Sequence, residues 1–274
     1  MFAVTSMLSV GLGYSARQIL DPLRNRRGVL RAVVTNFVIV PLLAFTVVQA
    51  LSLERAPATG LILIGSAAGA PFVVKLTKIA RGDMAFSATL LVLLLIVTIF
   101  YMPLFVPLVV PDVTVNAFDI GISLTLTMLL PLAIGHLIEA YAPSLAHRLV
   151  PLMGKLSSFS LVTLIAATFI LYLPAIMSIG TRAILGAALL TGGAFISGYF
   201  LINRSSHRRS VMGLGTAQRN IAAATVVAQT FTDSGVLVMV VVTSLVDLAI
   251  LFPIAWVLRR HKGEDSSEKL RRAA

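Results

Sequence analysis

The sequence predicts an all-α polytopic membrane protein. Of its 274 residues, 58% are hydrophobic and only 12% are charged. The mean hydropathy is +0.96, well above that of an ordinary soluble domain. Apolar runs long enough to span a bilayer alternate with short charged loops, and we expect nine helical spans from them. The absence of cysteine excludes disulfides, thiolate metal sites and cysteine nucleophiles.

Four spans are expected in the first part of the chain. The first could be a signal peptide, but its basic residues follow the apolar run instead of preceding it, which favours a helix that stays in the protein. The third is interrupted by the stretch GSAAGAP at residues 65–71, which predicts a broken helix. In order, the expected spans are Met1–Leu20, Leu30–Leu51, Pro57–Arg81 and Asp83–Val109.

Five further spans are expected after an acidic loop with Asp112 and Asp119. The seventh is rich in glycine, which favours close helix packing. The last contains Asp247 and leads into a polar tail that we expect to be solvated. In order, these spans are Ala117–Ala140, Leu152–Met177, Arg182–Ile202, Val211–Thr230 and Ser234–Leu258.

The basic residues test this division of the chain. Arg55 and Arg182 fall in loops on one side, whereas Lys75 and Arg219 fall within spans. The positive-inside rule then predicts a multi-pass protein of the cell membrane, with its N-terminus outside and its C-terminus inside. The other 18 of the 22 basic residues share the second side: Arg17, Arg24, Arg26, Arg27, Arg31, Lys78, Arg81, Arg148, Lys155, Arg204, Arg208, Arg209, Arg259, Arg260, Lys262, Lys269, Arg271 and Arg272.

The eighth span, Val211–Thr230, carries a polar break at bilayer depth. Backbone groups freed by such a break cannot be satisfied by lipid, so the break must lie beside protein or a water-filled cavity. Arg219 is too far from either end of the span to reach water easily, and a charged group at that depth marks a functional site by default. The polar and glycine residues of the break are Gly213, Gly215, Thr216, Gln218, Arg219 and Asn220.

Broken helices at the third and eighth positions predict an inverted-repeat transporter fold. One repeat would be a truncated four-helix unit at residues 1–110, the other a five-helix unit at 111–259, followed by a cytoplasmic tail at 260–274. In such folds the two broken helices cross near the bilayer midplane, where half-helix ends face a substrate or an ion. The alternative is that glycine and proline only permit tight packing.

Two stretches carry a resemblance to the bile acid:sodium symporter family. The turn Ala80-Arg81-Gly82-Asp83-Met84-Ala85-Phe86-Ser87 resembles that family's Ala-Arg-Gly-Asn turn, and residues 216–224, TAQRNIAAA, resemble its glutamine-containing break. The resemblance implies ten helices in two inverted repeats, with a core domain that moves against a panel domain, and transport of organic anions with sodium. This chain matches from the family's second helix onward, so we expect a nine-helix member.

The resemblance implies sodium ligands only in part. Asn36, Ser87 and Gln218 stand at ligand positions and are the candidate residual sodium ligands. Four other positions of the family's ligand set hold apolar residues, which offer no side-chain oxygen to a hard cation. These apolar residues are Val73, Val74, Leu91 and Leu214.

Two cations appear near the missing ligands. We hypothesise that Lys75 and Arg219 replace the charge that bound sodium supplies and attract an anion. As alternatives, Lys75 could extend the basic end of its helix and snorkel, and Arg219 could form a structural ion pair with Asp247. That pair could also exchange partners on protonation, which would couple transport to protons.

The function expected from these residues is secondary transport of a small organic anion by alternating access, with no cofactor other than sodium as a candidate coupling ion, a role that the replaced ligands weaken. Proton-coupled or uncoupled carriage and a passive anion channel are the alternatives. An enzyme is disfavoured because the spans hold no catalytic motif, and the four histidines lack metal-ligand spacing. Basic charge confined to alternate loops argues against nucleic acid as a partner. The expected substrate or ion crossing consists of Lys75, Gln218, Arg219, Asn220 and Asp247.

Overall fold

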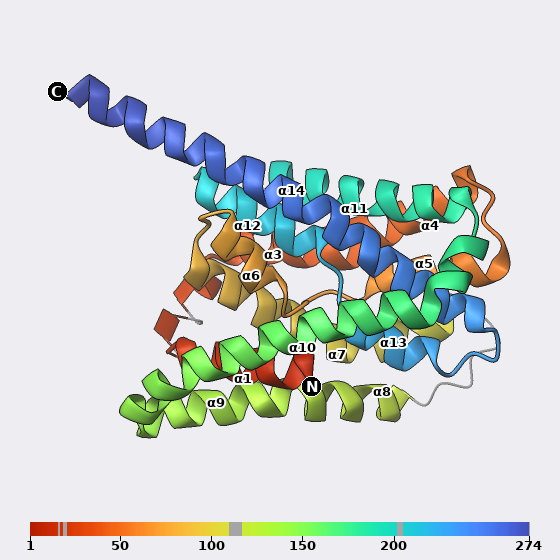
Figure 1. Cartoon of the computed structure of the whole chain (residues 1–274), viewed down its shortest axis with the longest axis horizontal. Coiled ribbons are helices and arrows are strands. Elements are labelled where there is room, and N and C mark those ends of the chain that lie inside the picture. Colours follow the sequence, from red (N-terminus) through yellow and green to blue (C-terminus); the bar gives the residue numbers. More distant parts are fainter. Residues whose placement is uncertain (16, 19–20, 110–116, 202–204, 274) are drawn as a thin grey trace.

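The structure is a computed structural model that describes residues 1–15, 17–18, 21–109, 117–201 and 205–273. Its described residues form helices joined by turns and short extended segments (Figure 1). Five helices are long and apolar enough to cross a membrane: 26–50, 84–108, 121–141, 181–201 and 234–260. The prediction of an all-helical, multi-pass membrane protein is therefore confirmed.

The helices follow one another closely along the chain. Two of them contain a π-helical turn, in which the backbone makes one wider turn without ending the helix. The elements are α1 (Phe2–Gly13), η1 (Asp21–Arg24), α3 (Arg26–Val34), η2 (Thr35–Ile39, π), α4 (Val40–Ala50), α5 (Arg55–Ser66), α6 (Val73–Ile79), α7 (Met84–Val109), α8 (Ala117–Leu124), η3 (Thr125–Leu129, π), α9 (Leu130–Tyr141), α10 (Pro143–Ser178), α11 (Thr181–Leu201), α12 (Ser206–Ala217), α13 (Ile221–Ala228) and α14 (Ser234–Ala273).

Several helix ends differ from the sequence-based expectation. Helix α1 ends at Gly13, before the expected Leu20, because Tyr14 adopts an extended conformation. Helix α10 begins at Pro143, before the expected Leu152, since proline is readily accepted in a first helical turn. Helix α14 continues to Ala273, beyond the expected end of the last span at Leu258 (Figure 1). Asp112 and Arg204 lie outside the described residues.

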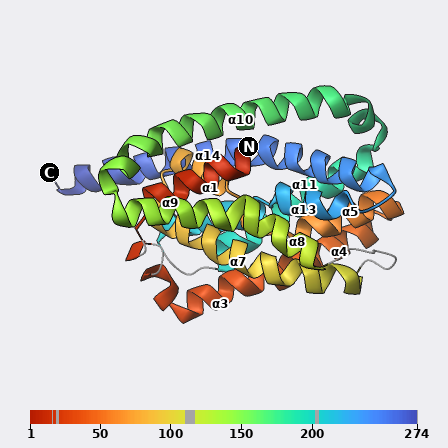
Figure 2. The same cartoon turned by 90° about the horizontal axis from the view of Figure 1, so that it is seen from below.

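The helices form two groups. Helix α1 packs against α9 and α10, and these helices lie together in the lower part of Figure 1. The larger group contains α5 against α14, α11 against α12 and α14, and α4 against α11. Figure 2 shows α10 and α3 on opposite faces of the bundle. Contacts of α8 with α7 and α13, and of α10 with α14, connect the two groups.

Small residues allow the backbones of α1 and α9 to touch. A Cβ atom on Gly11 would lie 2.2 Å from the carbonyl oxygen of Leu132, and one on Gly135 would lie 2.6 Å from that of Leu8. In lipid, helix association depends on this kind of close van der Waals packing because burial of apolar surface adds no driving force. Gly11 and Gly135 therefore fix α1 on α9.

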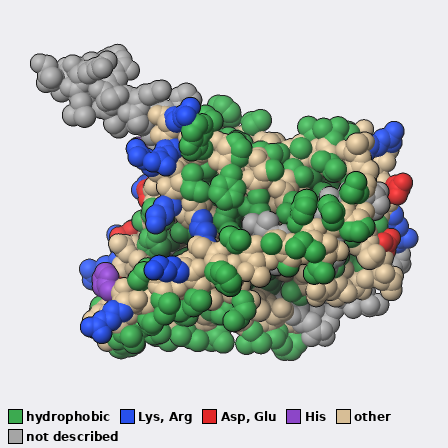
Figure 3. All heavy atoms as spheres, viewed as in Figure 1, with side chains coloured by type: hydrophobic (Ala, Val, Ile, Leu, Met, Phe, Trp, Pro, Cys, Tyr) green, Lys and Arg blue, Asp and Glu red, His purple; other side chains and the backbone are tan. Residues whose placement is uncertain are grey.

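The charged side chains lie mainly at the ends of the bundle. Lys and Arg gather at the end from which α14 projects, whereas the opposite end shows fewer basic groups, and Asp and Glu are visible at both ends (Figure 3). Hydrophobic side chains cover most of the surface between the two ends in this view. Exposed apolar residues on α10 such as Phe159, Phe169 and Ile170 fit a lipid-facing wall.

Candidate functional site

The first broken helix is interrupted between Ser66, where α5 ends, and Val73, where α6 begins. Gly69 has a φ of +78°, which favours glycine, and a Cβ there would lie 2.5 Å from the amide nitrogen of Leu95. The Thr98 hydroxyl of α7 serves both backbone groups of Ala68: it accepts from the N–H at 3.2 Å and lies 3.0 Å from the oxygen. Protein groups thus replace the lost intrahelical bonds, as membrane depth requires.

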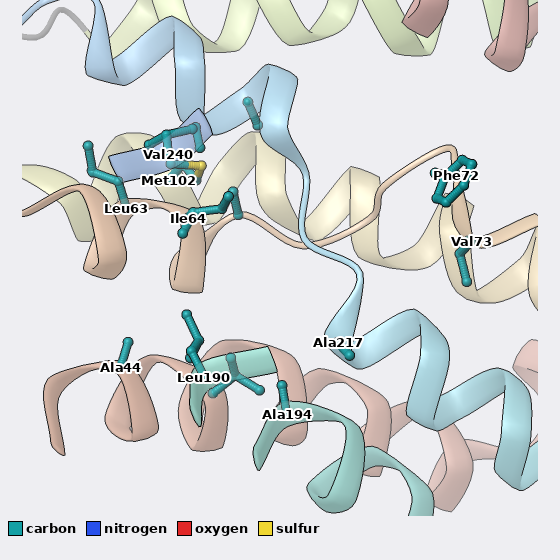
Figure 4. Close-up of a cluster of buried hydrophobic side chains, with 14 of the residues drawn as sticks. Ala44, Leu63, Ile64, Phe72, Val73, Met102, Leu190, Ala194, Ala217 and Val240 are labelled. Carbon is teal, nitrogen blue, oxygen red and sulfur yellow. The ribbon is translucent and has the colours of Figure 1, made fainter. Parts of the chain in front are cut away.

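The second broken helix is interrupted between Ala217 and Ile221, and its linker crosses the first linker (Figure 4). The Asn220 backbone N–H donates to the Ala67 oxygen at 2.8 Å, and its side-chain amide donates to the Gly69 oxygen at 3.1 Å. The same side chain caps α13, because its Oδ1 accepts from the Ala223 N–H at 3.1 Å. Asn220 therefore joins the two breaks.

Arg219 is the largest of the fully buried side chains, at 1% exposure. A guanidinium has five N–H donors, and the structure provides five oxygen contacts for them. Nε donates to the Ile64 oxygen (3.3 Å), one terminal nitrogen to Asn36 Oδ1 (2.9 Å) and the Thr216 oxygen (3.1 Å), and the other to the Gly65 and Asn36 oxygens. We call these five oxygens the Arg219 cage.

Asn36 enters the cage through the π-helical turn η2 in the helix that runs from α3 to α4. Its Nδ2 donates to the Ala32 oxygen at 2.9 Å and to Thr216 Oγ1 at 3.3 Å, which orients Oδ1 toward the guanidinium. The wider turn also leaves backbone oxygens available to other partners: Tyr101 donates to the Phe37 oxygen at 3.0 Å. Asn36 therefore binds the guanidinium of Arg219, a cation that is covalently part of the chain.

The cage contains no carboxylate. The alternative of a structural ion pair with Asp247 holds only as an interaction through space, because all five guanidinium hydrogen bonds go to backbone or amide oxygens. Asp247 is buried on α14 at 1% exposure, and its Oδ1 is hydrogen-bonded to the Thr191 hydroxyl of α11. Its interaction with Arg219 is electrostatic and includes the Arg219 backbone N–H.

Gln218 lies beside the cage and faces a small cavity of about 60 Å³. Its Oε1 atom is buried and has no hydrogen-bond partner among the described residues. Arg219 and Asn220 also line this cavity, together with Ser244 and Leu248 of α14 and Phe2 of α1. Gln218 therefore presents an unpaired acceptor where the two groups of helices meet.

Lys75 does not join this cluster, which corrects the expectation of one crossing site. Its Nζ donates to the Ser158 hydroxyl of α10 at 3.0 Å and lies 5.6 Å from the centre of the Phe2 ring. It lines a second cavity, of about 850 Å³, between α6, α1 and α10, together with Lys78 and Lys155. We call this the lysine cavity.

The remaining expected ligand positions are separated from the cage. The Ser87 hydroxyl of α7 is buried and accepts from Thr77 of α6 at 2.9 Å, so it closes the contact between these two helices. Val73, Leu91 and Leu214 are fully buried within one apolar cluster. They fill with hydrocarbon the positions at which the family resemblance places oxygen ligands.

Two functional residues were missed by the sequence reasoning. Thr98 holds the first break, and Thr191 is the partner of Asp247. Each is a hydroxyl inside an otherwise apolar span, which is the signal that could have revealed them. A threonine in a membrane helix usually bonds to its own backbone, so this signal is weak without the structure.

A bundle of membrane helices in which two interrupted members meet around a buried cation defines the class of the protein: a multi-pass membrane transporter. The sequence comparison specifies the group. The pattern of the Sodium Bile acid symporter family matches residues 2–179, and the chain belongs to that family, whose members are transporters and not enzymes. The matched range ends before α12 and α13, so Arg219 and Asn220 lie beyond it.

The chain is also similar to curated plant proteins. It is 32% identical over 209 residues to the probable sodium/metabolite cotransporter BASS2, chloroplastic, of Oryza sativa subsp. japonica, covering 74% of this chain and 49% of the rice protein. Identity to the probable sodium/metabolite cotransporter BASS1, chloroplastic, of Arabidopsis thaliana is 25% over 195 residues, covering 71% of this chain and 49% of that protein. The chain spans about half the length of the curated relatives it matches.

Proposed function

We propose that this protein is a secondary transporter of a small organic anion, in which the guanidinium of Arg219 takes the place of a bound sodium ion. The observation that carries the proposal is the Arg219 cage: five uncharged oxygens around one buried cation. Carbonyl and amide oxygens are also the ligands that hard metal cations prefer. Here the cation is part of the chain and cannot dissociate.

The candidate sodium ligands support this substitution. Asn36 Oδ1 already accepts from Arg219, and Ser87 is engaged with Thr77 away from the cage. Gln218 retains a free Oε1, but a single amide oxygen is too few for sodium, which needs several oxygen ligands. Although relatives are named as sodium/metabolite cotransporters, we propose that this chain does not require sodium.

The lysine cavity is the proposed entrance for the anion. Lys75, Lys78 and Lys155 give its wall a positive charge, and Ser157 contributes a buried hydroxyl without a partner among the described residues. An anion drawn there by charge would lie between α6 and α10, which belong to the two helix groups. The small cavity beside Gln218 and Arg219 lies at the crossing of the linkers and would receive the anionic group.

Alternating access would come from movement between the two groups. We propose that α1, α8, α9 and α10 form the panel and the remaining helices the core, with the repeats at 1–110 and 111–259. The crossing of the α5–α6 and α12–α13 linkers supports this, because crossed broken helices are typical of inverted-repeat transporters. The basic end in Figure 3 supports an inside C-terminus and an outside N-terminus.

A stabilisation screen followed by uptake tests the proposal. Carboxylates and sulfonates of increasing size are added to the purified protein, because a ligand that binds only the folded state raises its melting temperature. An anion that stabilises the wild type and not Lys75→Met is then loaded into proteoliposome assays with sodium chloride or choline chloride. Equal saturable uptake in both salts supports the proposal, whereas a strict sodium requirement refutes it.

A passive anion channel is the competing outcome. A carrier saturates and accelerates uptake of labelled anion when unlabelled anion is present on the opposite side, whereas a channel conducts linearly with concentration. Flux that does not saturate and shows no such counterflow would replace the carrier with a channel.

A further inference from the structure

The Asp247 carboxyl group is buried between helices and has no hydrogen-bonded cation among the residues that the structure describes. Its Oδ1 contacts the Thr191 hydroxyl, and its Oδ2 has no hydrogen-bond partner in the described part of the chain. The backbone N–H of Arg219 faces the carboxyl, but the guanidinium makes its hydrogen bonds to the cage. A fully ionised carboxylate in this position would be poorly compensated, since a buried charge needs a paired and hydrogen-bonded partner.

The Thr191 hydroxyl makes two hydrogen-bond contacts with a single proton. Its Oγ1 lies 2.8 Å from the Ala187 oxygen and also within hydrogen-bond distance of Asp247 Oδ1. A hydroxyl has one proton to donate but two lone pairs to accept with. Each contact is a full hydrogen bond when Thr191 donates to the Ala187 oxygen and accepts a hydrogen bond from the carboxylic acid of Asp247. When Asp247 is ionised, the hydroxyl can turn and donate to it instead.

The arrangement therefore suits both states of the carboxyl group. The neutral acid has an acceptor for its proton, and the carboxylate has a donor in Thr191 and a positive charge nearby in Arg219. The helices packed against α14 carry other charged or titratable groups, none of which is a hydrogen-bond partner of Asp247 in the described part of the chain: Arg55 on α5, Lys75 and Lys78 on α6, His147, Arg148 and Lys155 on α10, Arg182 and Tyr199 on α11, and His207, Arg208 and Arg209 on α12. Arg219 is the charge that faces Asp247 most directly.

A cavity large enough for water lies one helical turn from Asp247. Ser244, one helical turn before Asp247, lines the cavity of about 60 Å³ next to Gln218 and Arg219. That volume exceeds the roughly 10–15 Å³ of probe-occupied space that one water molecule needs. The free Oε1 of Gln218 gives such water a polar partner on the far wall.

We propose that Asp247 and Thr191 form a proton-binding site whose occupancy sets the net charge beside the crossing. With a proton on Asp247, the guanidinium of Arg219 is uncompensated and favours an anion in the adjacent cavity. After the proton leaves, the carboxylate offsets the guanidinium and the anion is held less strongly. This inference rests on the proposed function in making the proton the coupling ion, but binding of the proton itself does not depend on transport.

Infrared difference spectroscopy tests proton binding without a transported anion. The purified full chain in lipid nanodiscs is titrated from mildly acidic to mildly alkaline buffer. A carboxylic acid C=O band should disappear as the pH rises, should be absent in Asp247→Asn and should remain in Asp233→Asn, which changes an exposed aspartate just before α14. Thr191→Val should change the frequency of the band, because the acid loses its hydrogen-bond partner.

Two results would overturn the proposal. One is a set of identical difference spectra for the wild type and Asp247→Asn. The other is a band in Thr191→Val with unchanged frequency, which would show that the hydroxyl is not the partner of the acid. Because no anion enters the experiment, failure of the transport screen leaves this result standing, and failure of the titration leaves anion transport standing.

Discussion

Arg219 holds together residues that are far apart in the sequence. Its guanidinium connects the last turn of α5, the π-helical turn at Asn36 and the end of α12. Hydrogen bonds to a charged group contribute about 1.5–3 kcal/mol each, and a buried acceptor without a partner costs about 1–3 kcal/mol. The charge is thus a structural necessity of the crossing as well as a functional group.

Removal of the guanidinium should convert the cage into a sodium site. Arg219→Ala is expected to lower stability by more than about 3 kcal/mol in choline chloride, because several buried oxygens lose their donor. Sodium chloride should restore part of that loss by filling the cage, and it should leave the wild type unchanged. Thermal unfolding in detergent measures both effects.

The control for this experiment is Arg208→Ala. Arg208 pairs with Asp83 at 2.9 Å, but both side chains are partly exposed, so the loss should stay near 1 kcal/mol or below and should not respond to sodium. Equal behaviour of Arg219→Ala in sodium and choline salts would argue against the view that the guanidinium stands where a cation binds.

Lys75 should contribute to anion binding and contribute little to the stability of the fold. Its Nζ reaches the lysine cavity, where it donates to the Ser158 hydroxyl and lies near the Phe2 ring, so Lys75→Met should keep the melting temperature within a few degrees while it weakens anion binding severalfold. The stabilisation screen measures both quantities in one experiment. Anion binding equal to that of the wild type would exclude Lys75 from the entrance.

At the scale of elements, Asn220 couples two helix breaks. Asn220→Asp keeps the oxygen that caps α13 but loses the amide donor to the Gly69 oxygen, whereas Asn220→Ala loses both. Asn220→Ala should therefore lower the free energy of unfolding more than Asn220→Asp does, by about the 1 kcal/mol of a helix cap. The cost of burying the new Asp charge reduces this difference. Hydrogen exchange of the α13 amides separates the loss of the helix cap from the cost of the new charge. Fast exchange is expected for the Ala variant and slow exchange for the Asp variant.

Gly69 makes a second element-scale prediction. Gly69→Ala combines a positive φ with a Cβ 2.5 Å from the Leu95 amide nitrogen, and overpacking of this kind costs about 1–3 kcal/mol. Gly192→Ala in α11 is the matched control, since no atom lies within 4 Å of its Cβ and alanine favours a helix. Comparable melting temperatures for the two variants would contradict the described path of the first linker.

The sequence predicted the elements better than their contacts. The breaks at 65–71 and 213–220 were predictable because glycine, proline and polar residues interrupt otherwise apolar spans. The π-helical turn that brings Asn36 to Arg219 was not, because residues 35–39 carry no local signal for a wider turn. The alternative of a pair between Arg219 and Asp247 involves no direct side-chain hydrogen bond, because backbone oxygens supply acceptors to the guanidinium.

Lys75 shows a related limit. Its place in the sequence predicted a position near the crossing, but rotation about the α6 axis decides which neighbour it faces, and that depends on tertiary packing. The structure directs it toward Ser158 of α10. The site expected as one cluster is therefore divided between the Arg219 cage and the lysine cavity.

At the scale of the whole molecule, the absence of cysteine allows a direct test of alternating access. Ser158→Cys places a single thiol in the wall of the lysine cavity, between α6 and α10. A membrane-impermeant maleimide should label it from the side that carries the basic end, and a transported anion should slow the labelling. Equal labelling from both sides without an anion would indicate a continuous pore.

The central claim is that the tethered cation of Arg219 replaces sodium, and equilibrium binding of radioactive sodium to the purified wild-type chain tests it most directly. We predict no saturable binding, because the cage is filled by the guanidinium and three other family ligand positions are held by the buried apolar residues Val73, Leu91 and Leu214. Saturable binding of sodium that choline does not displace would contradict the account.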